Sequence, residues 1–553
     1  MTTAAVHAEL VFRNGPVHTI DNSRRTASAV AVRGGVIVAV GHDGDVEDLI
    51  GPHTEVVDLA GRALLPGFQD SHAHPAFAGM ALIRCDLSEA EDAAEALALI
   101  AEYARREPDR EWVDGGGWSM QWFPGGTPTA ELLDTVVPDR PAYFINADGH
   151  GAWVNSYALR LCGIDRDTPD PADGRIERDA DGNPSGTLHE GAVGLVADQL
   201  PATSEQDALR ALLAGQERMH SFGVTGWQDA MVGSPHGGFD PLGAYLTAAR
   251  SGQLTARVVG ALWWDRERGA EQVPELLERR AAGQVGRFRA TSVKIMQDGV
   301  AENFTAALTR PYLDGCGCGT ANQGLSFVAP QALREHVTLL DSHDFQVHVH
   351  AVGDRAAREA LDAFEQARAE NGPGDRRHHI AHLQVVHPED VPRFAELDVT
   401  ANIQPLWATH EPQMDELTIP FLGEELAAWQ YPFGDLLRAG ATMAAGSDWP
   451  VSSPNPLWGI HVAVNRRYPD TDTESFLPAQ RIELTAALAA YTIGTAYVNH
   501  ADDTTGSIET GKLADLVVVD RDPFAGPAEE IHAARVLATY VEGELVYRDP
   551  SFH

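Results

Sequence analysis

Short apolar segments alternate with amphipathic segments through the middle of the chain. Each apolar segment ends in a polar or glycine-rich turn, and alanine- and leucine-rich stretches such as PQALREHVTLLDSH and DRAAREALDAFEQARAE follow several of them. Short continuous apolar runs are typical of strands buried on both faces, whereas apolar residues three and four positions apart are typical of helices that cover a sheet. The eight strand candidates begin near residues 67, 223, 257, 292, 345, 378, 398 and 441.

This alternation predicts an α/β protein whose central part, residues 67–500, is a (β/α)8 TIM barrel. In such barrels the functional side chains lie at the carboxyl ends of the strands. Residues 112–190 are too long for a single crossover, so we expect them to form an insertion after the first strand.

The two ends of the chain share a different pattern. Residues 8–64 and 506–547 contain short alternating or β-branched segments, which in the first range are broken at Asn-Gly and Gly-Gly turns. The first of these ranges leads directly into the first barrel strand. We therefore expect residues 1–66 and 501–553 to fold together as one composite β-sandwich beside the barrel.

Composition and charge narrow the function. The chain has 553 residues, 44% hydrophobic and 22% charged, as in ordinary globular proteins. Its 80 acidic and 41 basic residues give a net charge of −39, which argues against binding to nucleic acids or membranes and favours a small-molecule substrate. The amino terminus lacks a cationic start followed by an apolar run, so we expect a cytoplasmic protein. A homodimer is compatible with such a barrel.

The four cysteines are too few for a disulfide framework in a chain of this length. Two of them, Cys316 and Cys318, stand in the glycine-rich segment DGCGCGTANQG. A metal or redox role for this pair needs partner ligands that the neighbouring sequence does not supply. The other two are Cys85 and Cys162.

Unusual polar residues fall at the predicted strand ends. A single histidine at a strand end is often only a hydrogen-bonded structural residue. A lysine between Val293 and Ile295 is harder to explain, because buried lysine is rare unless it is paired or modified. A shared functional rim explains the whole group better than coincidence. The group comprises His72, His74, Lys294, His350, His382 and Asp448.

The His-x-His spacing follows from the period of a strand. Residues 72 and 74 point to the same side, where two neutral imidazoles can bind one cation. Asp448 can complete this site from the opposite wall of the barrel. His350 and His382, on adjacent strands, can hold a second cation.

Two neighbouring cations require an anion between them. Lys294 can supply it if its neutral amine adds carbon dioxide to form a carbamate with two bridging oxygens. A site of low dielectric constant favours the neutral amine that this reaction needs.

These motifs together resemble the amidohydrolase superfamily, specifically its amidohydrolase-3 (YtcJ-like) branch. The resemblance rests on PGFQDSHAHP, VKIMQDG, VHVHAVGD, HHIAHLQ, GSDWPV and GSIETGKLADLVVVD, and on NADGHGAWVNSYAL and PSGTLHEGA in the insertion. It covers nearly the whole chain. It implies a metal-dependent hydrolase of carbon-nitrogen bonds other than peptide bonds, with two Zn²⁺ per chain bridged by carbamylated Lys294. The six residues named above are then the metal ligands.

The resemblance also suggests a mechanism and a substrate. We expect Asp448 to act as general base and then general acid, while an ion held by His350 and His382 polarises the carbonyl. The many tryptophan and phenylalanine residues near strand ends favour a neutral, largely apolar amide, and the chain is similar to N-substituted formamide deformylases. Further substrate-binding candidates are Trp118, Asp148, His150, Glu190 and Asp298, although the polar ones could equally cap loops and Asp298 could orient Lys294.

Two alternatives remain at this stage. The first is a mononuclear deaminase or cyclic-amide hydrolase that acts on a heterocycle and does not use the lysine. The second is a non-catalytic regulatory relative that keeps the barrel. Metal content separates the first alternative from a two-metal enzyme. Loss of ligands is expected for the second, whereas this chain has the full set.

Overall fold

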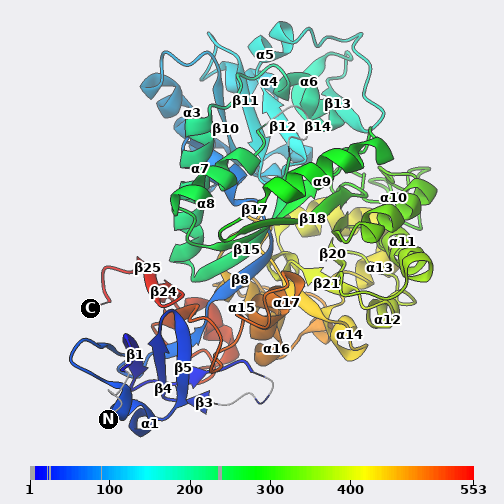
Figure 1. The fold of residues 1–553 in the computed structure, drawn as a ribbon. Coiled ribbons are helices and arrows are strands. Elements are labelled where there is room, and N and C mark those ends of the chain that lie inside the picture. Colours follow the sequence, from blue (N-terminus) through cyan, green and yellow to red (C-terminus); the bar gives the residue numbers. More distant parts are fainter. Residues whose placement is uncertain (1–6, 22, 24–25, 89, 234–238, 553) are drawn as a thin grey trace.

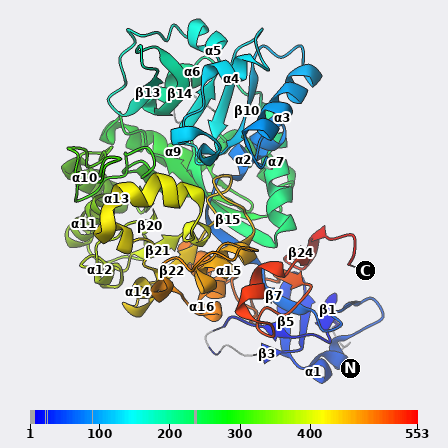
Figure 2. The ribbon, with the colours of Figure 1, turned by 180° about the vertical axis from the view of Figure 1, so that it is seen from behind.

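The computed structural model describes residues 7–21, 23, 26–88, 90–233 and 239–552. Three parts are visible in Figure 1. The barrel occupies the centre, a smaller α/β insertion lies above it, and a β-sandwich that contains both ends of the described chain lies below it. Figure 2 shows the same arrangement from behind.

The barrel wall consists of eight parallel strands in sequence order, and each predicted strand is present. Their neighbours pair in parallel from the first strand to the eighth. The strands are β8 (Phe68–Ala73), β15 (Val224–Val232), β16 (Arg257–Trp263), β18 (Phe288–Met296), β19 (Gln346–Ala351), β20 (His379–His382), β21 (Thr400–Ile403) and β22 (Met443–Ala445). A two-residue strand, β17 (Gln284–Val285), pairs with β18. The predicted TIM barrel is therefore confirmed.

Amphipathic helices cover the outside of the barrel. In α11, for example, Ala356, Ala360, Ala363 and Ala367 are all buried, at the three- and four-residue spacing of one helix face. The barrel helices are α2 (Pro75–Leu82), α7 (Glu205–Ser221), α8 (Leu242–Ser251), α9 (Val273–Ala282), α10 (Pro330–Ser342), α11 (Asp354–Asn371), α12 (Val391–Glu396), α13 (Ile419–Ala428), α14 (Phe433–Arg438), α15 (Pro456–Asn465), α16 (Leu484–Ala489) and α17 (Thr495–Val498). No helix within the described ranges is long and apolar enough to cross a bilayer.

The barrel closes where β8 meets the chain that follows β22. The amide of Asp448 donates to the carbonyl of His72 at 2.7 Å, and the amide of His74 donates to the carbonyl of Trp449 at 2.8 Å. Asp70, buried in β8, accepts hydrogen bonds from the backbone amide and the hydroxyl of Ser447 at 3.1 and 2.6 Å. The contact is so close that a Cβ on Gly446 would lie 2.6 Å from the amide nitrogen of His72.

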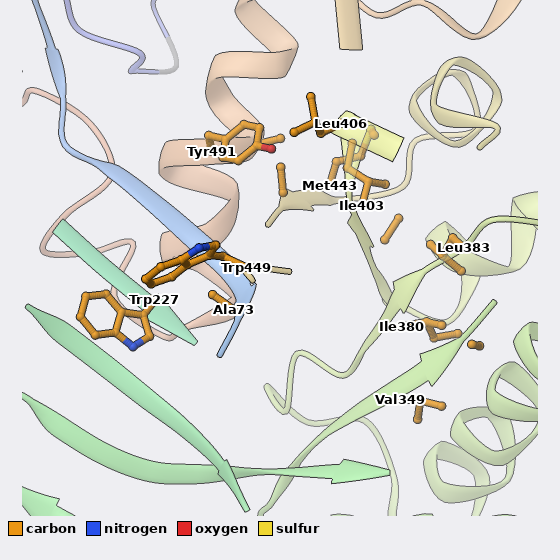
Figure 3. Packing of buried hydrophobic residues seen from close by; sticks show 14 of the residues in the cluster. Ala73, Trp227, Val349, Ile380, Leu383, Ile403, Leu406, Met443, Trp449 and Tyr491 are labelled. Atoms are coloured by element: carbon orange, nitrogen blue, oxygen red, sulfur yellow. The ribbon is translucent and has the colours of Figure 1, made fainter. Parts of the chain in front are cut away.

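Apolar side chains pack against this closure. Figure 3 shows Trp227 and Trp449 close to Ala73 at the end of β8, and Tyr491 beside a neighbouring helix. All of them belong to the large core cluster of the barrel. Burial of these aromatic side chains stabilises the seam from its apolar side.

The insertion contains a six-stranded sheet in the order β13-β14-β12-β11-β10-β9. Its strands are β9 (Cys85–Asp86), β10 (Val113–Trp118), β11 (Ala142–Asn146), β12 (Gly151–Val154), β13 (Gly174–Arg178) and β14 (Pro184–Glu190), and its helices include α3 (Ala93–Arg106), α4 (Ala130–Asp134), α5 (Ser156–Leu161) and α6 (Gly194–Ala197). The sheet therefore begins upstream of residue 112. A two-residue strand has no periodicity, and α3 has the same amphipathic pattern as a barrel helix, so the sequence does not mark this start.

The β-sandwich combines segments from both ends of the chain. β23 (Leu516–Val519) pairs antiparallel with β7 (Ala63–Pro66), which confirms the predicted composite sheet. The remaining strands are β1 (Leu10–Arg13), β2 (Val17–His18), β3 (Thr26–Ala27), β4 (Ala29–Arg33), β5 (Val36–Gly41), β6 (Glu55–Asp58), β24 (Val536–Val541) and β25 (Glu544–Arg548), with the short helix α1 (Asp43–Val46). Residues from both of its sheets share one apolar core. The boundaries 1–66, 67–500 and 501–553 stay predictions.

We expect Asp70→Ala to lower the free energy of unfolding by about 3 kcal/mol or more. The change leaves the amides of His72 and Ser447 and the hydroxyl of Ser447 without their buried acceptor, at about 1–3 kcal/mol each. Urea unfolding measures the loss. The control is Asp165→Ala, which removes an exposed carboxylate that accepts two backbone amides. Equal effects of the two variants would contradict the role given to Asp70.

Candidate metal centre

The six polar residues predicted at the strand ends meet at one end of the barrel. His72 lies in β8, Lys294 in β18, His350 in β19 and His382 at the end of β20, while His74 and Asp448 follow β8 and β22. These are the carboxyl ends of parallel strands, where side chains from different strands converge.

Asp448 is the centre of this group. Its Oδ1 lies 3.2 Å from Nε2 of His72 and 3.0 Å from Nε2 of His74, so both imidazoles face the same carboxylate, as the strand period predicts. Nζ of Lys294 lies 3.3 Å from Nε2 of His72. The rings of His350 and His382 are 4.4 Å apart between centroids. All six side chains thus form one continuous cluster.

Three members can hold a single metal ion as they stand. One ligand atom from each of His72, His382 and Asp448 lies within 4.8 Å of the other two, and all three residues are buried. Nδ1 of His382 is buried without a hydrogen-bond partner, which suits a nitrogen reserved for a ligand. Two imidazoles and a carboxylate are a donor set that divalent transition metals accept. His72 and Asp448 of this trio belong to the first predicted ion site, whereas His382 was predicted to hold the second ion.

Burial keeps the basic groups in the forms that bind metals. It lowers the pKa of His72, His350 and His382 well below the usual range, and it lowers the pKa of Lys294 to about 7. Burial alone would raise the pKa of Asp448, but the hydrogen bond from His74 and the other basic groups around the carboxylate outweigh burial and lower that pKa. The cluster therefore contains neutral imidazoles and an ionised carboxylate near neutral pH.

Asp298 orients His350. Its Oδ1 lies 3.1 Å from Nδ1 of His350 and accepts the amide of Val352 at 3.0 Å, while Oδ2 accepts the amides of Gly353 and Ala307 at 2.8 and 2.9 Å. Burial raises the pKa of Asp298 to about 7, and these backbone donors oppose the rise. When the ionised carboxylate accepts a hydrogen bond from Nδ1–H, Nε2 of His350 is left unprotonated. The side chain of Asp298 thus contacts His350, whereas a role in orienting Lys294 stays a prediction.

The insertion brings an ion pair to the same rim. Nδ1 of His150 lies 2.9 Å from Oε2 of Glu190, whose Oε1 accepts the hydroxyl of Thr305 at 2.7 Å. The ring of His150 is 5.7 Å from that of His350. Although burial opposes the charged forms, this pairing raises the pKa of His150 and lowers the pKa of Glu190. Asp148 accepts the backbone amide of His150 at 2.8 Å and so closes the turn.

Two other sequence candidates lie elsewhere. Trp118 is fully buried in the apolar core of the insertion, against Phe123 and Trp153, and its Nε1 donates to the carbonyl of Phe144. This placement gives it a packing role. Cys316 and Cys318 are exposed in a loop whose amides bind the side chain of Asp314.

Trp407 contacts the centre, because its ring stacks on His382 with an interplanar angle of 1°.

Sequence reasoning missed two buried histidines inside the barrel. His348 and His379 are both 0% exposed, and their rings are 4.0 Å apart. Nε2 of His348 lies 2.9 Å from Nδ1 of His72. His348 stands two residues before His350 in VHVHAVGD, so the same period of two that linked His72 to His74 could have found it.

Comparison with known proteins agrees with this geometry. A model of the amidohydrolase family matches residues 55–547. Protein LONG AFTER FAR-RED 3 from Arabidopsis thaliana is 32% identical, over 98% of this chain and 92% of that protein. N-substituted formamide deformylase from Arthrobacter pascens is 29% identical, over 98% of each. A solved structure of an uncharacterized metal-dependent hydrolase from Pyrococcus furiosus, 25% identical, covers 93% of this chain and 99% of its own with a TM-score of 0.71.

We expect Glu190→Gln to lower the pKa of His150 by about one unit or more, because the carboxylate that stabilises its imidazolium is lost. NMR titration of labelled histidine in the metal-free protein measures this change, with the signal assigned by its loss in His150→Gln. The matched control is Glu177→Gln, which removes the carboxylate 3.1 Å from His189 in the same insertion. An unchanged titration of His150 in Glu190→Gln would contradict the pairing.

Proposed function

Because the chain belongs to the amidohydrolase family, we propose that it is a metal-dependent hydrolase that cleaves the carbon-nitrogen bond of a small, largely apolar amide. An N-substituted formamide is the substrate class that we would test first. The observation that carries this proposal is the cluster of His72, His382 and Asp448, whose ligand atoms converge in a buried site at the barrel rim.

The residues for two ions are available around this trio. His72, His74 and Asp448 would hold one ion, His350 and His382 the other, and carbamylated Lys294 would bridge them. Bound divalent ions, with zinc the best match to these donors, supply a water of lowered pKa and polarise the substrate carbonyl. Forming the carbamate joins the Lys294 nitrogen to the carbon of carbon dioxide and releases one proton. The lowered pKa of Lys294, about 7, favours the neutral amine required.

Asp448 is the proposed proton carrier. Its lowered pKa keeps it ionised near neutral pH, so it can accept the proton of the attacking water. The same proton can then pass to the leaving nitrogen, which departs as an amine. Oδ1 of Asp448 lies 3.0 Å from Nε2 of His74, and the hydrogen bond from His74 helps to keep the carboxylate ionised. His350 and His382 complete the proposed catalytic set.

The surroundings favour an apolar group on the amide. Trp407, stacked on His382, offers an aromatic surface next to the centre. The relative from Arthrobacter pascens is named as a deformylase of N-substituted formamides and aligns over nearly its full length. These features support an amide with an aryl or alkyl group on nitrogen.

A mononuclear enzyme is the second candidate. Only one trio satisfies the ligand spacing for a single ion within the part of the chain that the structure describes. A deaminase or cyclic-amide hydrolase acting on a heterocycle would need no more than this trio. Metal analysis distinguishes the two: about two ions per chain with modified Lys294 supports the binuclear centre, whereas one ion with unmodified lysine supports the alternative.

We expect the zinc-loaded enzyme to convert N-benzylformamide to formate and benzylamine in equal amounts. The apolar ring suits the aromatic surface, and formyl is the smallest acyl group that the site must admit. Formate and amine are measured together, with the metal-stripped protein as control. Absence of formate release under zinc saturation would exclude this substrate class.

We expect Asp448→Asn to lower kcat by about 10²–10⁴-fold, because a neutral amide cannot accept the proton of water. Metal content should remain nearly that of the wild type, since the amide oxygen can still coordinate. Activity and bound metal are measured on the same sample. Asp520→Asn, in the β-sandwich, serves as the control and should retain kcat. Wild-type kcat in Asp448→Asn would remove this residue from the proposed mechanism.

A further inference from the structure

A row of buried polar side chains runs through the interior of the barrel below His72. Gln346 begins β19 at the amino-terminal end of the barrel, His348 lies two residues farther along the same strand, and Gln228 lies in the middle of β15. None of the three is more than 4% exposed. Branched apolar side chains usually fill this space, so a polar row here calls for a functional explanation.

The orientation of this row is fixed at its lower end. Nε2 of Gln346 donates to the backbone carbonyls of Arg377 and Val498, at 2.9 and 2.7 Å. Carbonyl oxygens only accept, so both of these contacts require the NH2 end of the amide. The Oε1 atom of Gln346 therefore points the other way, towards Gln228.

The orientation of Gln228 follows from that of Gln346. Nε2 of Gln228 donates to Oε1 of Gln346 at 3.0 Å and to Oδ1 of Asn499 at 3.1 Å. Both hydrogens of its NH2 group are then used. Oε1 of Gln228 is left to face Nδ1 of His348 at 2.7 Å, and because this oxygen only accepts, Nδ1 must carry a proton.

The same reasoning assigns the ring nitrogen of His72 that carries the proton. His348 is completely buried, and its two ring nitrogens face the amide of Gln228 and the imidazole of His72, so it is neutral and its single N–H proton is on Nδ1. Nε2 of His348 can only accept, and its partner at 2.9 Å is Nδ1 of His72. Nδ1 of His72 must therefore donate. The unprotonated Nε2 of His72 then faces Lys294 and Asp448.

We propose that this relay, from the carbonyls of Arg377 and Val498 through Gln346, Gln228 and His348, fixes His72 in its Nδ1–H tautomer and so presents Nε2 to the metal site. Gln228 and His348 are positioning residues. In a neutral imidazole either nitrogen can carry the proton, and the wrong tautomer would place a hydrogen where the metal must bind. The ligand role of His72 rests on the proposed metal centre, whereas its tautomer does not.

The test begins with the metal-free wild-type protein. Long-range couplings between ring protons and ¹⁵N in labelled histidine report which nitrogen of His72 carries the proton, with the signal assigned by its loss in His72→Gln. We expect the proton on Nδ1. A proton on Nε2 would overturn the proposal, and this measurement requires no variant of the relay itself to fold.

Variants of Gln228 then test the relay. Gln228→Met keeps the length of the side chain but removes the acceptor for His348, so we expect the Nδ1–H signature of His72 to be lost and zinc affinity to fall about 10–100-fold. Gln228→Glu instead places a carboxylate against Nδ1 of His348, where it stabilises the doubly protonated ring. Nε2 of His348 would then donate to Nδ1 of His72, so we expect the proton of His72 to move to Nε2 in this variant. The control is Gln216→Met, another buried glutamine whose bonds go to Gln253, Thr255 and Ala256.

The outcomes separate the relay from the metal centre. Wild-type tautomer and zinc affinity in Gln228→Met would overturn the relay, as would an equal loss of affinity in Gln216→Met. If the wild-type protein bound no zinc but His72 carried its proton on Nδ1, the proposed metal centre would fail while the tautomer assignment was supported.

Discussion

The candidate site depends on the seam where the last barrel strand returns to the first. Main-chain hydrogen bonds join His72 and His74 to Asp448 and Trp449, and the carboxylate of Asp70 holds the amide and hydroxyl of Ser447. His74 and Asp448 are 374 positions apart in the chain, yet their side chains are in contact. A barrel that failed to close at this seam would separate the paired histidines from the carboxylate that they share.

The second constraint is the exclusion of water from the barrel interior. Burial makes charge on an imidazole costly, which keeps the histidines of the rim neutral with lone pairs available for a metal. A buried polar group must also find a hydrogen-bond partner, and the glutamines below His72 meet that need while defining the direction of each hydrogen bond. Stability and ligand orientation are therefore supplied by the same contacts. Asp298 serves His350 in the corresponding way from the loop after β18.

Much of this could be predicted from the sequence, for identifiable physical reasons. Each barrel strand is an apolar run that ends in a turn, and the period of two placed His72 and His74 on one face. Other features depend on contacts between distant segments. The two residues of β9 have no pattern of their own, Asp298 reaches His350 only through the folded loop, and the grouping of His72 with His382 follows from the curvature of the barrel. Trp118 shows the opposite difficulty, because a tryptophan near a strand end packs a core as readily as it lines a pocket.

The most direct test of the central claim is a crystal structure of the zinc-loaded protein with anomalous diffraction data collected at the zinc edge. We expect an anomalous peak at about 2.0–2.2 Å from ligand atoms of His72, His382 and Asp448. A second peak towards His350, with extra density on Nζ of Lys294, is expected for the binuclear centre. Zinc found only at sites away from these residues, with the rim of the barrel empty, would contradict the claim that these side chains form a metal centre.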